Sequence, residues 1–200
     1  MMKTIYHLVG LSLSMALLLP IKAQATPANM LLYVHPQEYA HSVKLWEYFN
    51  DYWFKQGPAV EPVATELLSE AFGQVAMCTA NSEGNMLVWL QPKMYFNPQL
   101  KVFHGEITAN AYRSDGAPVA SYIGKARKVG FLDVAPQQQI EMVYKMAMEK
   151  LVATMRQDEN LKSLAAEGQS NANAGAACAL VASFPPPKII DSDYFLKGIH

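Results

Sequence analysis

Residues 100–128 read LKVFHGEITANAYRSDGAPVASYIGKARK, and this stretch decides the fold. Over residues 100–112, apolar or small side chains alternate with polar ones, which is the period of a strand with one buried face. Asp115-Gly116 is a typical turn dipeptide, and residues 119–128 have the pattern of a returning partner strand. The stretch therefore predicts an antiparallel hairpin with one polar face.

The segments on either side extend this hairpin into a small domain. Residues 86–95 are strand-like, with Pro92 marking an edge or a bulge, so residues 86–128 are expected to form a meander. Residues 136–157 carry apolar side chains at helical spacing, and we expect this helix to cover the apolar face of the meander. The predicted class is α+β, an antiparallel meander of about three to five strands packed against a long C-terminal helix and one or two N-terminal helices.

Upstream of the meander, the sequence predicts two more strands, one of them a short one over residues 75–79, and two helices. Residues 30–35 form a short apolar run that is typical of a buried strand. A helix is expected over residues 42–56, ended by Gly57-Pro58, and a second over residues 61–72.

Residues 1–25 have the pattern of a cleavable signal peptide. Lys3 supplies the positive start, residues 8–19 are largely apolar, Pro20 ends the run, and residues 23–25 fit the small-x-small cleavage pattern. An uncleaved anchor is the alternative, although about a dozen apolar residues fall short of the roughly 20 that a spanning helix needs. No later stretch is long and apolar enough to span a membrane. We therefore expect export to the periplasm or beyond it, with no membrane span in the mature chain.

The two cysteines indicate a disulfide. In an exported chain, Cys78 and Cys178 most simply form one bridge, and two separate buried thiols are the alternative. The expected organisation is a signal peptide over residues 1–25, an α+β domain over residues 26–160, and a linker with a C-terminal tail over residues 161–200 that the bridge ties back.

Charge and motifs exclude several classes of function. The chain has 16 basic and 17 acidic residues, and removal of the leader takes away two lysines and no acid, which leaves a net charge of −3. This balance disfavours nucleic acid and anionic lipid as partners. Neither a Gly-x-Ser-x-Gly elbow nor a glycine-rich phosphate loop is present, so we expect no enzyme activity and no cofactor.

A weak metal-site candidate lies near the N-terminus. His35, Glu38 and His41 combine imidazole and carboxylate groups of the kind that bind zinc. Their spacing crosses a strand-to-helix connection that contains Pro36, so the three residues do not share one helical turn. Two solvated histidines beside a loop are the simpler reading.

The most unusual segment is residues 46–54, WEYFNDYWF, in which six of nine residues are aromatic. If this segment were helical, its aromatic rings would form two offset stripes, and both could not pack on one sheet. The surplus predicts a surface that binds a protein partner, and a wide core-facing surface with tyrosine hydroxyls at its rim is the alternative. The predicted contact residues are Trp46, Tyr48, Tyr52 and Trp53.

A second candidate surface is the predicted edge strand around residues 93–98, which includes Tyr95 and Phe96. An exposed edge can accept an added strand from another chain. The alternative is a kinked edge that its prolines protect from pairing.

The order of elements over residues 63–155 resembles the α+β module of bacterial envelope-assembly proteins. The resemblance is carried by the helix that includes Leu67-Leu68, the hairpin over residues 107–123, and the helix that begins at Pro136. The N-terminal domain of the Tol-system propeller protein and the related module of curli-secretion-type lipoproteins are the examples. The resemblance implies a non-catalytic adaptor in envelope assembly, transport or an envelope machine. The sequence departs from these examples in that it shows no lipobox cysteine and no following propeller, and its aromatic segment is additional.

Taken with the export signal, these features predict a non-catalytic periplasmic protein-interaction module. Its role would be that of an adaptor or accessory subunit of an envelope assembly or transport machine, with a protein partner in the cell envelope. The alternative is a periplasmic carrier of a small ligand or a metal. The sequence leaves the oligomeric state open.

Overall fold

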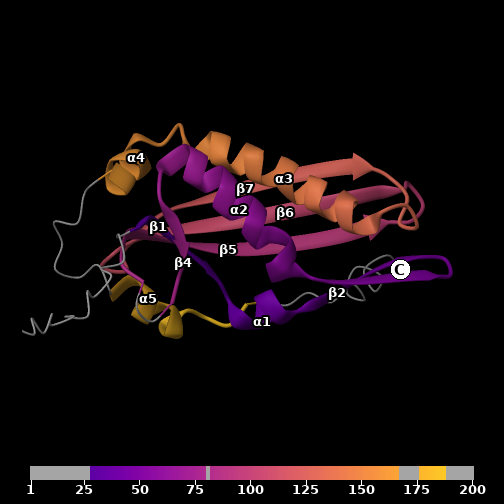
Figure 1. Ribbon diagram of the computed structural model, residues 1–200, viewed down its shortest axis with the longest axis horizontal. Coiled ribbons are helices and arrows are strands. Elements are labelled where there is room, and N and C mark those ends of the chain that lie inside the picture. The colour runs from indigo at the N-terminus through magenta and orange to yellow at the C-terminus, as the bar shows by residue number, and fades with distance from the viewer. Residues whose placement is uncertain (1–27, 80–81, 167–175, 188–200) are drawn as a thin grey trace, which may run out of the picture.

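The computed structural model describes residues 28–79, 82–166 and 176–187, and the statements below concern these residues (Figure 1). The expected signal peptide, residues 1–25, lies outside the described residues.

The domain is built on a five-stranded sheet. Strand β1 is parallel to both of its neighbours, β4 and β5, whereas β5, β6 and β7 pair antiparallel in sequence order. The prediction of the α+β class is confirmed, but the sheet is mixed, because the crossover helix α2 (Gln56–Phe72) leads from β1 to the edge strand β4, and both β4 and β5 run parallel to β1. In the order β4-β1-β5-β6-β7, the strands span Val75–Met77, Ala28–Val34, Gly84–Asn97, Val102–Arg113 and Pro118–Val129.

Local chemistry explains the turn between β6 and β7. Gly116 adopts a positive φ of 88°, a conformation that side chains disfavour. Asp115 Oδ1 accepts a hydrogen bond from the backbone N–H of Ala117 (3.0 Å), and the N–H of Arg113 donates to the carbonyl of Ala117 (2.9 Å). These contacts fix the register of the two long strands.

Two long helices cover one face of the sheet. Helices α2 (Gln56–Phe72) and α3 (Pro136–Met155) lie side by side on this face, and the shorter α4 (Glu159–Ala166) follows at the end of α3 (Figure 1). The apolar stripe of α3 is buried against β6 and β7. Because Gly124 of β7 has no side chain, α3 approaches this strand closely: a Cβ there would lie 2.1 Å from the carbonyl oxygen of Ala147.

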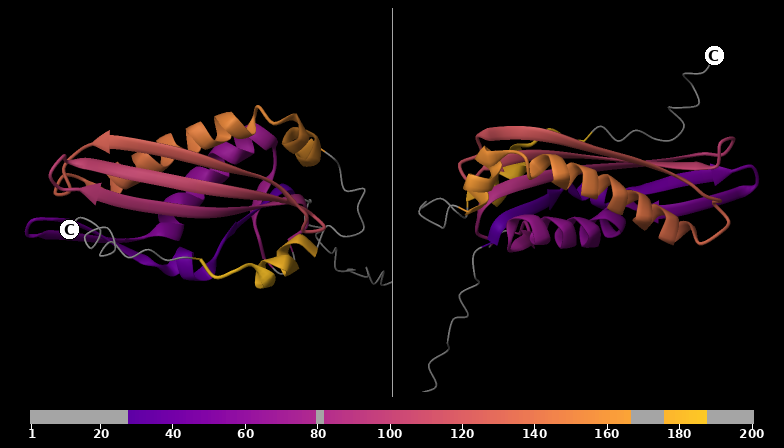
Figure 2. Two further views of the ribbon diagram at one scale, coloured as in Figure 1. Left: turned by 180° about the vertical axis from the view of Figure 1, so that it is seen from behind. Right: turned by 90° about the horizontal axis from the view of Figure 1, so that it is seen from above.

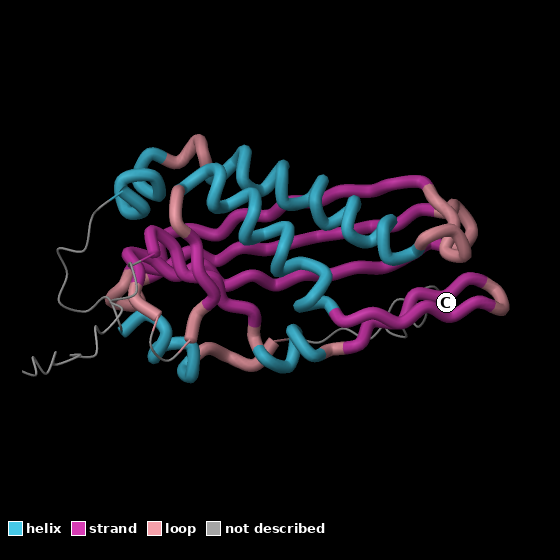
Figure 3. The backbone as a smooth tube through the Cα atoms, viewed as in Figure 1, coloured by secondary structure: helices cyan, strands magenta, loops and turns pink. Residues whose placement is uncertain are grey.

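The prediction of a helix over residues 42–56 is wrong. Ser42–Glu47 and Asn50–Lys55 form strands β2 and β3 of a separate antiparallel hairpin (Figure 3). The segment has the aromatic content that strands favour, and its burial alternates with period 2, as in a half-buried strand. The aromatic stripes expected at helical spacing therefore do not exist.

The expected helix stop at Gly57-Pro58 is also wrong, because α2 begins at Gln56. Pro58 then falls in the first helical turn, where its missing N–H has no intrahelical role. Pro62 lies inside the helix.

The opposite face of the sheet is partly covered by the C-terminal part of the chain. The short helix α5 (Ala176–Leu180) and the 3₁₀ turn η1 (Val181–Ser183) lie on the side of the sheet away from α2 and α3 (Figure 2). Among the described helices, none combines the length and the apolar composition that crossing a membrane requires.

Candidate functional site

Exposed apolar side chains gather where the β2–β3 hairpin meets two loops, and we call this surface the aromatic end. The loops are those between β5 and β6 and between β7 and α3, and they lie at the same end of the molecule as the hairpin tip (Figure 1). Its side chains are between 55% and 103% exposed: Tyr48, Phe49, Trp53, Leu100, Val129, Phe131 and Val134.

A buried carboxylate holds the three parts of the aromatic end together. Glu47, at the end of β2, forms an ion pair with Lys101 of the first loop and accepts a hydrogen bond from the N–H of Leu132 in the second (3.2 Å). The ammonium group of Lys101 also lies 5.0 Å from the ring centroid of Tyr48, a cation–π contact. The N–H of Gly130 donates to the carbonyl of Lys101 (2.9 Å). The hairpin tip is therefore fixed in position rather than free to swing.

The hairpin has one buried and one open face, and these divide the predicted contact residues. Tyr52 lies on the inner face, half-buried, where its hydroxyl donates to Gln137 of α3 (3.2 Å). Trp46 and Trp53 lie on the outer face, half-buried and exposed respectively, and Lys44 lies 5.7 Å from the Trp53 ring. Tyr48 is exposed at the turn and, unusually for a non-glycine residue, has a positive φ of 51°.

Tyr95 and Phe96 point to opposite faces of β5. Phe96 is buried in the core against Phe103, with the ring centroids 4.6 Å apart, so it does not belong to the surface of this chain. Tyr95 is exposed and stacks on His104 at 4.3 Å. Burial and the nearby Arg127 charge hold the pKa of His104 below its usual value.

The three metal-site candidates are spread around the short helix α1 (Pro36–Ala40). Nδ1 of His35 accepts a hydrogen bond from the N–H of Gln37 (3.2 Å) at the helix start, and the N–H of His41 donates to the carbonyl of Glu38 at its end (3.3 Å). Within the described part of the chain, no three His, Cys, Asp or Glu side chains are placed to hold a metal ion.

Glu38 is buried against the face of the sheet that lies away from α2 and α3. Burial raises its pKa to about 7, against smaller lowering effects of the Trp89 indole and of Lys93. The indole N–H faces the carboxylate closely enough to influence it, but Nε1 of Trp89 and Oε2 of Glu38 do not reach hydrogen-bonding geometry and neither atom has another partner. The pKa of Tyr33 is raised by burial and by the same carboxylate. Glu38 therefore lies beside both aromatic residues.

We expect Glu38 to make stability depend on pH. Because its pKa is raised on folding, the folded chain binds a proton that the unfolded chain releases above about pH 4.5, so stability is lost as the pH rises from there and levels off above about 7. The free energy of unfolding from urea titrations should fall by about 1–3 kcal/mol over this range in the wild type, and E38Q should lack this component.

E66Q is the matched control, because Glu66 is exposed and forms only a long ion pair with Lys145 (3.8 Å). This variant should keep the pH dependence of the wild type. An E38Q protein that loses as much stability as the wild type between pH 5 and pH 8 would contradict the assignment.

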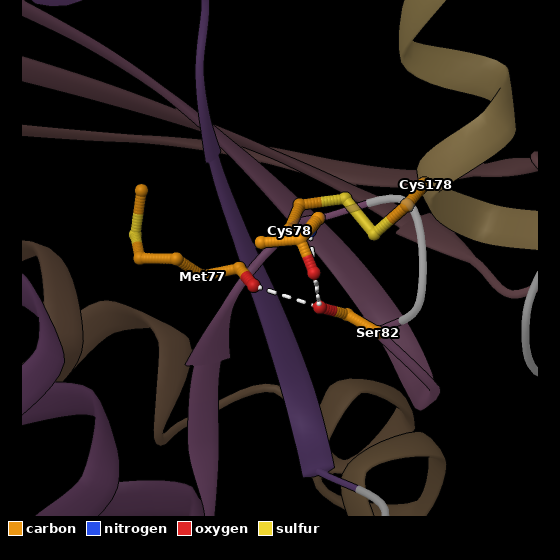
Figure 4. Close-up of a disulfide and its surroundings, with 5 residues drawn as sticks. Met77, Cys78, Ser82 and Cys178 are labelled. Carbon is orange, nitrogen blue, oxygen red and sulfur yellow. Dashed lines mark hydrogen bonds between the residues drawn. A yellow bond between two sulfur atoms is a disulfide. The ribbon is translucent and has the colours of Figure 1, made fainter.

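The predicted disulfide is present. Cys78, which follows β4, is bonded to Cys178 of α5, with the two Cα atoms 5.7 Å apart (Figure 4). The N–H of Cys78 donates to the carbonyl of Leu32 in β1 (2.7 Å), and Ser82 Oγ donates to the carbonyl of Met77 (3.0 Å). The bridge thus fastens the C-terminal segment to the end of the edge strand β4, next to β1.

Beyond the bridge, one aromatic ring anchors the C-terminal segment. The ring of Phe184 stacks on Trp89 (5.0 Å) and Tyr112 (4.8 Å) and meets Tyr33 edge-on (6.1 Å). Each such pair contributes about 0.5–1.5 kcal/mol beyond its buried area. Sequence reasoning missed this cluster, whose only signal was one large aromatic residue in each of three separate strands.

The chain matches no protein-family model and no curated protein sequence. Among solved structures, the PelC dodecamer from Paraburkholderia phytofirmans is similar at a TM-score of 0.38 and 12% identity, covering 64% of this chain and 91% of that one. A variant of the same dodecamer gives the same TM-score and identity over 62% and 89% of the two chains. Because a TM-score this low does not establish a common fold, the function is argued from the chain's own residues.

Proposed function

We propose that this chain is a non-catalytic protein-interaction module of the bacterial periplasm, an adaptor or accessory subunit of an envelope assembly or transport machine. The aromatic end is its partner-binding surface. The observation that carries the proposal is that seven exposed large apolar side chains belong to the hairpin and to the strand end and loops that lie at the same end of the molecule. A concentration of exposed apolar side chains, rich in aromatic residues, is typical of binding sites.

The shape and rigidity of the surface indicate the kind of partner. Phe49 is fully exposed at the hairpin turn, so the surface is convex there and calls for a partner with an apolar pocket. The Glu47–Lys101 ion pair keeps the tip ordered before binding, which lowers the entropy that association must overcome. The Lys44–Asp51 ion pair (2.8 Å) supplies polar groups beside Trp53, as at the rim of an interface.

The compartment is proposed on three grounds. Residues 1–25 have the pattern of an export signal. The Cys78–Cys178 disulfide fits an oxidising compartment, because cytosolic thiols are kept reduced. The element order that resembles envelope-assembly modules implies the same location.

The proposal is tested by crosslinking from the hairpin tip. A photo-reactive phenylalanine analogue at Phe49 should crosslink in the periplasm to one defined protein, and the same analogue at Ile123, an exposed residue of β7, should not. With that partner purified, the triple variant Y48S/F49S/W53S should bind it at least a hundredfold more weakly, since hot-spot aromatic residues each contribute about 2 kcal/mol or more.

The triple variant should keep its folding, because all three side chains are mainly exposed and their removal changes stability by less than about 1 kcal/mol. I123S is the matched surface control and should bind as the wild type does. Wild-type affinity in the triple variant would refute the role of the aromatic end. Loss of folding would show that these rings belong to the core.

A further inference from the structure

A second aromatic surface lies on the far face of the sheet, away from α2 and α3. Tyr33 of β1, Trp89 of β5 and Tyr112 of β6 project from this face, and we call them the aromatic platform. Tyr33 and Trp89 are directly paired across β1 and β5, so their positions are set by the strand register. The platform is therefore part of the rigid sheet rather than of a loop.

The platform already holds a ring of the chain itself, that of Phe184, which begins the run Phe-Pro-Pro-Pro over residues 184–187. Phe184 stacks on Trp89 and Tyr112, and the segment runs from there towards α1 (Figures 1 and 2). Aromatic-lined surfaces recognise proline-rich segments because these are already extended and lose little entropy on binding. The contact of the Phe184 ring with Trp89 and Tyr112 resembles that of a peptide side chain bound to an aromatic surface.

This resident segment is held by packing and not by hydrogen bonds to the sheet. Among the described residues, no hydrogen bond joins residues 181–187 to the sheet: Ser183 Oγ donates to the carbonyl of Leu180, and the N–H of Phe184 donates to the carbonyl of Val181. Phe184 is half-buried and Pro187 is buried, whereas Pro185 and Pro186 are exposed. Apart from the disulfide at Cys178, ring contacts are the directional interactions that retain it.

The resident segment also leaves polar groups beside the platform unpaired. Glu38 Oε2 and Trp89 Nε1 have no hydrogen-bond partner, although their residues are only 7% and 5% exposed. Buried polar atoms without a partner are uncommon and costly. The three prolines have no N–H, so their backbone cannot donate to the carboxylate. A ligand that carried a hydrogen-bond donor, such as a basic side chain, would satisfy the Glu38 carboxylate, whereas the indole N–H of Trp89 needs an acceptor.

We propose that the aromatic platform is a peptide-binding site for an aromatic residue followed by prolines, which residues 184–187 occupy in cis until a partner's segment of the same kind displaces them. The incoming aromatic ring takes the place of Phe184 over Trp89 and Tyr112. A basic group on the incoming segment pairs with Glu38. The site is distinct from the aromatic end and does not depend on it.

The test uses the full-length, oxidised F184A variant, in which the platform loses its resident ring. The probe is a blocked synthetic peptide with the sequence of residues 182–188, ASFPPPK. By isothermal titration calorimetry, it should bind F184A at least tenfold more tightly than it binds the wild type, whose platform is occupied. The same peptide with alanine in place of phenylalanine should bind at least tenfold more weakly.

Two further variants separate the platform from non-specific binding. E38Q in the F184A background should lower the affinity for the peptide by at least threefold. I123A in the same background should leave this affinity unchanged, because Ile123 is an exposed residue of β7. Circular dichroism and a thiol assay that finds no free cysteine establish that F184A is folded and bridged. Absence of saturable binding to such a protein, or equal binding to wild type and F184A, would overturn the proposal.

Discussion

Replacing Cys78 and Cys178 together by serine should lower the free energy of unfolding by about 3–5 kcal/mol. The bridge closes a loop with a sequence separation of 100 residues, for which chain entropy alone gives roughly 4.7 kcal/mol. Urea titration of the oxidised wild type and of the double variant, read by circular dichroism, measures the difference.

The wild type treated with a reductant is the matched control and should unfold at the same urea concentration as the double variant. Single variants should lose a similar amount, because either change removes the same covalent link. If the free energy of unfolding of the double variant lies within about 1 kcal/mol of that of the oxidised wild type, the C-terminal segment is retained without the bridge.

Gly124→Ala should destabilise the domain by about 3 kcal/mol or more, or prevent its folding. The added Cβ would meet the carbonyl oxygen of Ala147 at 2.1 Å and the Cβ of Leu151 at 2.8 Å. Both atoms belong to helix α3 or lie next to its backbone, so no side-chain rotation relieves the overlap, and the helix must move away from β7. The measurement is the urea midpoint, or the soluble yield if the protein does not fold.

Gly130→Ala is the control for this prediction. Its Cβ would lie 3.1 Å from Oε1 of Gln139, a flexible group that can move, and 3.3 Å from Cε2 of the buried Phe103 ring, so a shift of a few tenths of an ångström accommodates it. We expect a change of less than about 1 kcal/mol at this position. Equal stability of G124A and G130A would mean that α3 does not pack on β7 as described.

The elements that were predictable from sequence are those whose local pattern and tertiary environment agree. Strands β6 and β7 alternate between a buried and a polar face, the Asp115-Gly116 turn joins them, and α3 carries its apolar side chains at helical spacing. The parallel pairing of β1 with β4 and β5 has no local signal, because it depends on the crossover through α2. The sequence therefore predicted the class and not the complete sheet.

The error over residues 42–56 has a physical cause. In that segment, apolar residues fall at both helical and strand spacing, and only the packing of Val43, Leu45 and Phe54 on the core distinguishes the two. Composition alone was enough to single out the aromatic residues as a candidate surface. Composition could not reveal which of them face outwards, or that the side chains of Leu100, Phe131 and Val134 gather nearby, because those loops meet the hairpin only in the folded chain.

The central position of β1 has a consequence for the folding kinetics. Residues 28–34 come before both of their pairing partners, and the strand that completes their pairing begins only at Gly84. Contacts so distant in sequence slow the search for the native state, whereas the local hairpin of β6 and β7 can form early. Until β4 and β5 have both paired with it, the run Met-Leu-Leu-Tyr-Val has at least one open edge and is a template for misassembly between nascent chains. Refolding at high protein concentration should therefore lose yield to aggregates seeded by this strand.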